Sequence, residues 1–172
     1  MQEKSWPNFS KNLISRVGRV LNSGKINYTN GPYGVKFEKT FSKFVGNKYS
    51  IAVCNGTAAL EVAIKSLKLP KSSEIIVPAR SFFSSASSIV NTGYKPVFAD
   101  VNLYTQNISI KDIKKKISNK TKAIICVHLA GLPCDMQAIK KLANKKKLKI
   151  IEDCSQAHGA SINNKHVGSF GD

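Results

Sequence analysis

Two adjacent carboxylates, Glu152 and Asp153, close an apolar run that includes Ile150 and Ile151. A solvated turn needs only one acid, and a buried strand favours none. An aspartate at the end of a strand can hold a positively charged ring nitrogen, and Gln156 can offer its amide to a ring oxygen nearby. The alternative is that Asp153 only caps the turn after the strand, which is a common use of aspartate.

A second candidate site is Asn55-Gly56-Thr57, between an apolar run and a stretch with helical spacing. The first N–H groups of a helix and the positive end of its dipole favour a phosphate group. Gly56 allows close approach of a phosphate, and Thr57 can donate its hydroxyl. An ordinary helix cap is the alternative. Because the segment is neither a P-loop nor a G-x-G-x-x-G turn, a nucleoside triphosphate or NAD is disfavoured.

A third candidate is Phe82, which follows the apolar run at residues 75–77. An exposed ring near the end of a strand can stack on a flat cofactor, whereas the alternative is a core phenylalanine at the start of a helix. A phosphate site, an aromatic ring and a carboxylate together match a flat, phosphorylated ligand with a pyridinium ring. Pyridoxal 5'-phosphate (PLP) is such a ligand, because its ring nitrogen must stay protonated to withdraw electrons.

Short apolar runs rich in Ile and Val predict strands that are buried on both faces. The runs are residues 51–53, 75–77, 97–99, 123–127 and 150–151. Apolar side chains at helical spacing predict helices at residues 35–44, 60–67 and 136–143. Alternating strands and helices indicate an α/β fold with a mostly parallel sheet flanked by helices. In such a sheet, ligands bind beyond the carboxyl ends of the strands.

Composition bounds the class of protein. With 172 residues, 42% of them apolar and 22% charged, the chain is typical of one globular domain. It has no run of about 20 apolar residues and no apolar signal-peptide core near Met1, so we expect a cytoplasmic protein without a membrane partner. The four cysteines form no C-x-x-C pair and match no zinc pattern with the histidines, so we expect no metal site.

The net charge of +17 raises the question of a nucleic-acid partner. Nearly all of the excess is lysine, spread along the chain and densest at residues 114–116 and 145–147. Both triplets lie in helix-like stretches, where a lysine run usually forms a solvated face, and proteins that read bases favour arginine. We expect no nucleic-acid partner, with a non-catalytic basic module that binds nucleic acid as the alternative.

The three candidate sites are part of a pattern that extends over nearly the whole chain. This pattern resembles the DegT/StrS-type sugar aminotransferases, which are fold-type I PLP-dependent enzymes. The matching segments are residues 24–25, 31–34, 37–38, 55–60, 74–78, 96–101, 127–129, 151–153, 156–160 and 167–172. Each segment alone is common, but the combination is specific to that family.

The resemblance implies an aspartate-aminotransferase-like, PLP-binding large domain over residues 35–172, preceded by an N-terminal helix and loop at residues 1–34. It also implies six contacts with the cofactor. They are the phosphate ligands Gly56, Thr57 and Ala58, the ring-stacking Phe82, the ring-nitrogen partner Asp153 and the ring-hydroxyl partner Gln156.

The resemblance further implies a reaction and an assembly. Family members transfer an amino group from an amino acid, usually glutamate, to a nucleotide-linked keto sugar, in polysaccharide or amino-sugar biosynthesis. Their active sites lie at a homodimer interface, so we expect a homodimer when the chain is complete.

Some positions depart from the family pattern. Arg80 and Phe83 stand where smaller or aliphatic residues are expected, so the edge of the pocket should differ. The Schiff-base lysine of the family is expected beyond Asp172, and Lys165 does not match its position. We therefore expect a fragment, truncated within the large domain. A PLP-dependent sugar dehydratase of the same fold, with histidine in place of that lysine, and a non-catalytic cofactor-binding remnant stay as alternatives.

Overall fold

The computed structural model describes residues 7–172, and residues 1–6 of the predicted N-terminal segment lie outside the described part. The chain forms two compact units. The first holds the described residues up to Lys43 together with Lys48–Ala52, and the second holds Phe44–Asn47 and Val53–Asp172. The domain boundary predicted at residue 34 falls within the first unit and stays a prediction.

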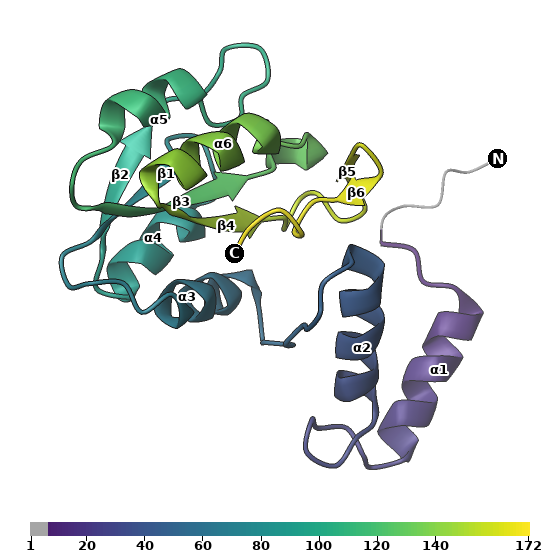
Figure 1. Ribbon diagram of the computed structural model, residues 1–172. Coiled ribbons are helices and arrows are strands. Elements are labelled where there is room, and N and C mark those ends of the chain that lie inside the picture. The colour runs from purple at the N-terminus through teal and green to yellow at the C-terminus, as the bar shows by residue number, and fades with distance from the viewer. Residues whose placement is uncertain (1–6) are drawn as a thin grey trace. The chain divides into compact units, whose positions relative to one another are not determined.

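The second unit is built on a four-stranded parallel sheet with the strand order β2-β1-β3-β4 (Figure 1). The strands are β1 (Glu74–Pro78), β2 (Lys95–Ala99), β3 (Thr121–Val127) and β4 (Lys149–Asp153). Val127 at the end of β3 lies opposite Asp153 at the end of β4. Because the strands run in the same direction, their carboxyl ends meet at one edge of the sheet.

Helices cover both faces of this sheet (Figure 1). They are α3 (Gly56–Ser66) and α4 (Phe83–Asn91) on one face and α5 (Ile110–Lys116) and α6 (Met136–Lys146) on the other. Alternate side chains of β3 supply the two cores: Ile125 packs with Ile64 and Ile89, and Ile124 packs with the core of α5 and α6. Residues 123–127 of β3 are buried on both faces of the sheet, which explains the continuous apolar run there.

Two short elements follow the strands at the carboxyl edge. The 3₁₀ turn η1 (Leu129–Gly131) comes directly after β3. The antiparallel pair of β5 (Ser161–Ile162) and β6 (Lys165–His166) comes after β4. After this hairpin the chain returns to β4, where the N–H groups of Gly168 and Phe170 donate to Glu152.

The first unit contains α1 (Lys11–Asn22) and most of α2 (Tyr33–Val45). The N–H of Leu13 donates to Oγ of Ser10, which caps α1 at a distance of 3.2 Å. On α2, the Glu38 carboxylate accepts the hydroxyl of Tyr28 at 2.9 Å and the N–H of Ala52 at 2.8 Å. These bonds hold the turn-rich segment between the helices and the start of the following segment against α2.

The structure confirms the helices predicted at residues 35–44, 60–67 and 136–143 and four of the five predicted strands. The strand predicted at residues 51–53 is wrong, because this stretch pairs with no strand among residues 7–172 and Ile51 is 77% exposed. An Ile- and Val-rich run becomes a strand only where a neighbour takes its N–H and C=O groups. Cys54, the residue after this stretch, is likewise exposed.

The lysine triplets lie at the ends of helices. Residues 114–116 form the last turn of α5, and residues 145–147 end α6, and all six side chains are exposed. A cation interacts favourably with the negative end of the helix dipole at the C-terminus. These lysines therefore stabilise the helices while their side chains remain solvated. Over residues 7–172, no helix combines the length and the apolar character that a membrane span requires.

Candidate functional site

Asp153 is the last residue of β4, and it is only 8% exposed. Its Oδ1 accepts both the N–H of Ser155 at 3.1 Å and the hydroxyl of Ser155 at 2.6 Å. Its Oδ2 accepts the hydroxyl of Ser85 at 3.2 Å. A carboxylate oxygen can accept two hydrogen bonds, so Oδ2 keeps one open position for a further donor.

The predicted phosphate site is the N-terminus of α3. Asn55 caps the helix, because its Oδ1 accepts the N–H of Ala58 at 2.9 Å. The N–H groups of Gly56 and Thr57 donate to no atom of the part of the chain that the structure describes. Of the three predicted phosphate ligands, Gly56 and Thr57 therefore offer free donors, whereas the donor of Ala58 is taken by the cap.

The phosphate site and Asp153 are neighbours. A Cβ placed on Gly56 would lie 3.4 Å from Oγ of Ser155, the serine that also bonds Asp153. From the sequence, the segments of Gly56 and Asp153 could be placed near each other only by the rule that ligands bind at the carboxyl ends of parallel strands. The structure shows that Gly56 lies next to Ser155.

Phe82 precedes α4 at the same edge. The ring is 71% exposed, so it packs in no core and is available for a ligand. The Oγ atoms of Ser81 and Ser85 lie 2.7 Å apart, and Ser85 donates to Asp153, so the start of α4 is tied to the end of β4. Sequence reasoning missed Ser85 and Ser155, and the only signal was their closeness to Phe82 and Asp153 along the chain.

Gln156 lies in the loop after β4 with its amide partly engaged. Its Oε1 accepts the N–H of Ala130 at 2.7 Å, and the side chain is otherwise exposed. The amide nitrogen Nε2 is the remaining polar group of this side chain, and it can only donate. The predicted role of Gln156 as a donor to a ring hydroxyl thus stays chemically available.

The edge residues Arg80 and Phe83 are both exposed. The Arg80 guanidinium donates to Oε1 of Gln106, and Phe83 is 81% exposed. Both residues lie beyond the end of β1, where the sequence departs from the family pattern. The difference predicted for the edge of the pocket stays a prediction.

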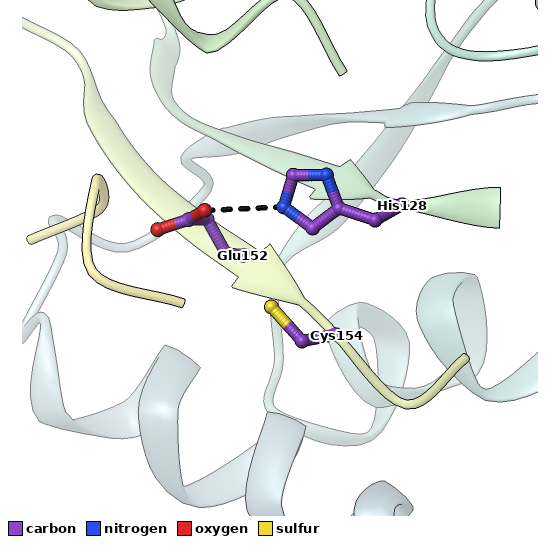
Figure 2. Close-up of side chains that lie close together, drawn as sticks. All are labelled: His128, Glu152 and Cys154. Atoms are coloured by element: carbon purple, nitrogen blue, oxygen red, sulfur yellow. Dashed lines mark hydrogen bonds and ion pairs between the residues drawn. The ribbon is translucent and has the colours of Figure 1, made fainter. Parts of the chain in front are cut away.

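Beside Asp153 lies a second cluster, made of the buried His128 and the partly buried Glu152 and Cys154 (Figure 2). Nε2 of His128 lies 3.1 Å from Oε2 of Glu152, and the two side chains are 0% and 3% exposed. Nδ1 of His128 accepts the N–H of Cys134 at 3.0 Å. The ring proton of a neutral His128 must therefore be on Nε2, from which it donates to Glu152.

This cluster is the group of three potential metal ligands found among residues 7–172. The two nitrogens of His128 are already used, one as an acceptor and one as a donor. Burial, together with the nearby carboxylates of Glu152 and Asp153, raises the pKa of the Cys154 thiol to about 12. A metal site needs a free imidazole nitrogen and a thiolate, so hydrogen bonding accounts for the cluster better than a metal does.

Glu152 is the centre of this cluster. Burial raises its pKa, but hydrogen bonds from His128 and from the N–H groups of Gly168, Gly171 and Phe170 outweigh burial, and the pKa lies below the ordinary value of 4.5. A carboxyl group whose pKa is lowered by folding stabilises the fold above its unfolded pKa. That stabilisation is lost as the pH falls through the folded pKa.

We therefore expect the Glu152 carboxylate to contribute to stability in a pH-dependent way. The free energy of unfolding of the wild type should exceed that of Glu152→Gln by a constant amount above about pH 5.5, and the gap should shrink below pH 4.5. Urea unfolding at pH 6.5, 5.5, 4.5 and 3.5 measures this. A gap that stays constant down to pH 3.5 would contradict it. The facing groups are His128, Cys126, Cys134 and Cys154, and the raised thiol pKa values keep the cysteines neutral throughout.

Comparisons with known proteins agree with this geometry. A model of the DegT/DnrJ/EryC1/StrS aminotransferase family matches residues 7–172. The chain belongs to this family. It is 44% identical over 156 residues to the GDP-perosamine synthase of Escherichia coli O157:H7, a match that covers 91% of this chain and 43% of that protein. The family member described here thus spans less than half the length of this relative.

Solved structures of the family are similar throughout the chain. An aminotransferase from Psychrobacter cryohalolentis matches 98% of this chain and 42% of its own, with a TM-score of 0.95 and 46% identity. The Escherichia coli GDP-4-keto-6-deoxy-D-mannose-3-dehydratase with bound hydrated PLP matches 97% of this chain and 44% of its own, with a TM-score of 0.90 and 31% identity. These similarities confirm the predicted fold, the large domain of a PLP-dependent enzyme.

The residues of this family member fit PLP. Two free N–H groups at the start of α3 suit the phosphate, the open position on Oδ2 of Asp153 suits a protonated ring nitrogen, and Phe82 offers an exposed ring. When bound, PLP supplies a positively charged ring that withdraws electrons from a reacting carbon.

Proposed function

We propose that this chain is part of a PLP-dependent aminotransferase that moves an amino group from an amino acid, glutamate in our proposal, to a nucleotide-linked keto sugar. The observation that carries the proposal is the buried Asp153 carboxylate, with an open position on Oδ2, beside a helix N-terminus that has two free N–H groups. We place the complete enzyme in the cytoplasm as a homodimer. Its product serves the biosynthesis of polysaccharides or amino sugars.

Each residue at the carboxyl edge has a role in this proposal. Gly56 and Thr57 would hold the phosphate through their free N–H groups at the start of α3. Asp153 keeps the ring nitrogen protonated, and Ser85 and Ser155 hold its carboxylate in place. Phe82, whose side chain is exposed, would stack on the cofactor ring and exclude water from it.

Two further residues complete the proposed site. Gln156 donates from Nε2 to the ring hydroxyl, since its Oε1 already accepts the N–H of Ala130. Ala58 is the third phosphate ligand, and its N–H can serve the phosphate only if it leaves Oδ1 of Asn55. A lysine beyond Asp172 in the complete protein would carry the proton to and from the substrate carbon.

A sugar dehydratase is the second candidate function, favoured by the similarity to the dehydratase at 31% identity. The aminotransferase comes first because the aminotransferase structure is 46% identical over a similar length. The cofactor site described above serves both reactions. What separates them is the fate of the nitrogen, which an aminotransferase leaves on the sugar.

The first test is binding of PLP to the chain itself. We expect PLP to bind and pyridoxal, which lacks the phosphate, to bind about 100-fold more weakly, because two charge-assisted hydrogen bonds are lost. Absorbance titrations with both compounds measure this ratio. Equal affinities would remove the phosphate site from the proposal, and the absence of PLP binding would remove the proposal.

The second step uses the complete protein with ¹⁵N-glutamate and GDP-4-keto-6-deoxymannose. Nitrogen-15 on the sugar indicates an aminotransferase, and loss of a sugar hydroxyl without retained nitrogen indicates a dehydratase. Bound PLP with neither product indicates the non-catalytic remnant. Binding of random duplex DNA that weakens steeply with salt would instead favour the basic nucleic-acid module.

A further inference from the structure

The Glu152 carboxylate lies at the meeting point of three segments. Its Oε2 accepts from Nε2 of His128 at 3.1 Å and from the N–H of Gly168 at 2.9 Å. Its Oε1 accepts the N–H groups of Phe170 and Gly171, each at 2.6 Å. Four donors fill the four acceptor positions of a carboxylate, so Glu152 has no capacity left for a ligand. Any effect of Glu152 on the site therefore passes through the segments that it joins.

The first of these segments is the loop that carries Gln156. This Gln156 loop, residues 154–167, leaves β4 directly after Asp153 and returns at Gly168. The bond from Gly168 to Glu152 closes the loop at its base, and a Cβ on Gly168 would lie 3.3 Å from Sγ of Cys154. Glu152 thus fixes the separation of the two ends of the Gln156 loop.

The second segment is the loop that carries Ala130, residues 129–134, which follows β3. Its end is tied back to its start, because Nδ1 of His128 accepts the N–H of Cys134. The N–H of His128 also donates to the carbonyl of Asp153 at 3.1 Å, which joins this base to the end of β4. Within this loop, the N–H of Ala130 donates to Oε1 of Gln156. The bond between His128 and Glu152 therefore joins the bases of the two loops, and the Gln156–Ala130 bond joins the loops a second time, further along each of them.

The loops also touch next to this bond. A Cβ added to Gly131, whose φ is +84°, would lie 3.4 Å from the carbonyl oxygen of Gln156. At such close packing, a small shift of either base moves the Gln156 amide relative to Ala130. The direction of Nε2 is therefore set by the bases of both loops.

We propose that Glu152, acting with His128, is a positioning residue that orients the Gln156 amide toward the ring hydroxyl of the cofactor. The effect on the cofactor rests on the proposed function, whereas the coupling of the two loops by Glu152 does not. Glu152 touches no reacting group, and its effect passes through the two loops and the Gln156–Ala130 bond. The neutral His128 cannot adopt the other tautomer, because a proton on Nδ1 would point at the N–H of Cys134. Nε2 therefore keeps its proton and its bond to Glu152.

The test compares Glu152→Gln with the wild type in two measurements. A glutamine presents an NH₂ group to two of the four donors, whichever way its amide turns. We expect hydrogen exchange at Gly168 and at Ala130 to become about tenfold faster, while exchange at Ile124 in the sheet stays unchanged. A carboxylate that holds only its own contacts would speed exchange at Gly168 and leave Ala130 unchanged, and that result would overturn the proposal.

The second measurement is the pH titration of the absorbance of bound PLP, which follows ionisation of the ring hydroxyl. Gln156→Ala removes the donor and should shift this titration to higher pH, because a hydrogen bond to the ionised oxygen favours ionisation. Glu152→Gln should shift it in the same direction, and the double variant should add little to the larger single shift. Additive shifts, or an unshifted titration in Glu152→Gln, would overturn the proposal.

Controls separate failure of this inference from failure of the proposed function. Glu74→Gln changes a glutamate at the opposite edge of the sheet that also accepts a serine hydroxyl, from Ser118 at 2.6 Å, and should leave both measurements unchanged. If Glu152→Gln does not fold, His128→Asn is the second variant, because asparagine can keep an acceptor for the N–H of Cys134 but cannot reach Glu152 as the ring does. If the wild type binds no PLP, the proposed function fails, and the exchange at Ala130 still decides whether Glu152 positions the loops.

Discussion

Asp153→Asn is expected to lower kcat/KM for amino transfer in the complete enzyme by a factor on the order of 10²–10³. The carboxylate is buried and holds the ring nitrogen in its protonated state in our proposal, so its removal leaves a neutral ring that withdraws electrons poorly. The structure suits this substitution, because asparagine has the same shape and its Oδ1 can still accept from Ser155. The loss should therefore fall on catalysis rather than on folding.

Asp135→Asn is the matched control for this variant. Asp135 caps α6 through its bond from the N–H of Ala138 at 3.0 Å, and asparagine caps a helix equally well. Its kcat/KM should stay within about twofold of the wild type. PLP methylated on the ring nitrogen carries a fixed positive charge and should restore part of the activity of Asp153→Asn. Unchanged turnover in Asp153→Asn, or no effect of the methylated cofactor, would contradict the assigned role.

Much of the fold could be predicted because buried segments consist of apolar residue types. The run at β3 is apolar at every position since Ile124 and Ile125 face opposite cores, and such a run predicts a central parallel strand. The stretch at residues 51–53 has the same composition and forms no strand. An apolar, β-branched composition indicates only that a segment is suited to a sheet. A strand also needs a neighbouring strand to pair with its backbone N–H and C=O groups, and this partner cannot be read from the segment itself.

The candidate site could be predicted only in part, and for a similar reason. Asp153 and Gly56 follow strand ends, so the rule for parallel sheets placed them at one edge. Ser85 and Ser155, which hold the carboxylate, are common residues without a distinctive spacing. The roles of Glu152 and His128 could not be predicted at all, because they depend on hydrogen bonds across 16 to 24 residues of chain.

The N-terminus of α3 allows a test in which binding and stability change in opposite directions. The first turn of α3 contains no acidic residue. A carboxylate there should stabilise the helix by about 0.3–1 kcal/mol, through its interaction with the positive end of the helix dipole. Thr57→Glu should therefore raise Tm slightly. The same charge would face the phosphate of PLP and should weaken binding by at least about 100-fold. Absorbance titration and thermal unfolding of the same samples measure both effects.

Thr57→Gln is the matched control, because glutamine has the size of glutamate without its charge. It removes the Thr57 hydroxyl and should weaken PLP binding by only about three- to tenfold. Binding of pyridoxal, which has no phosphate, should be similar in both variants and the wild type. Loss of PLP affinity through unfolding would lower Tm, whereas charge repulsion at the phosphate predicts a raised Tm with weaker binding. Wild-type affinity in Thr57→Glu would mean that the phosphate does not bind at the start of α3.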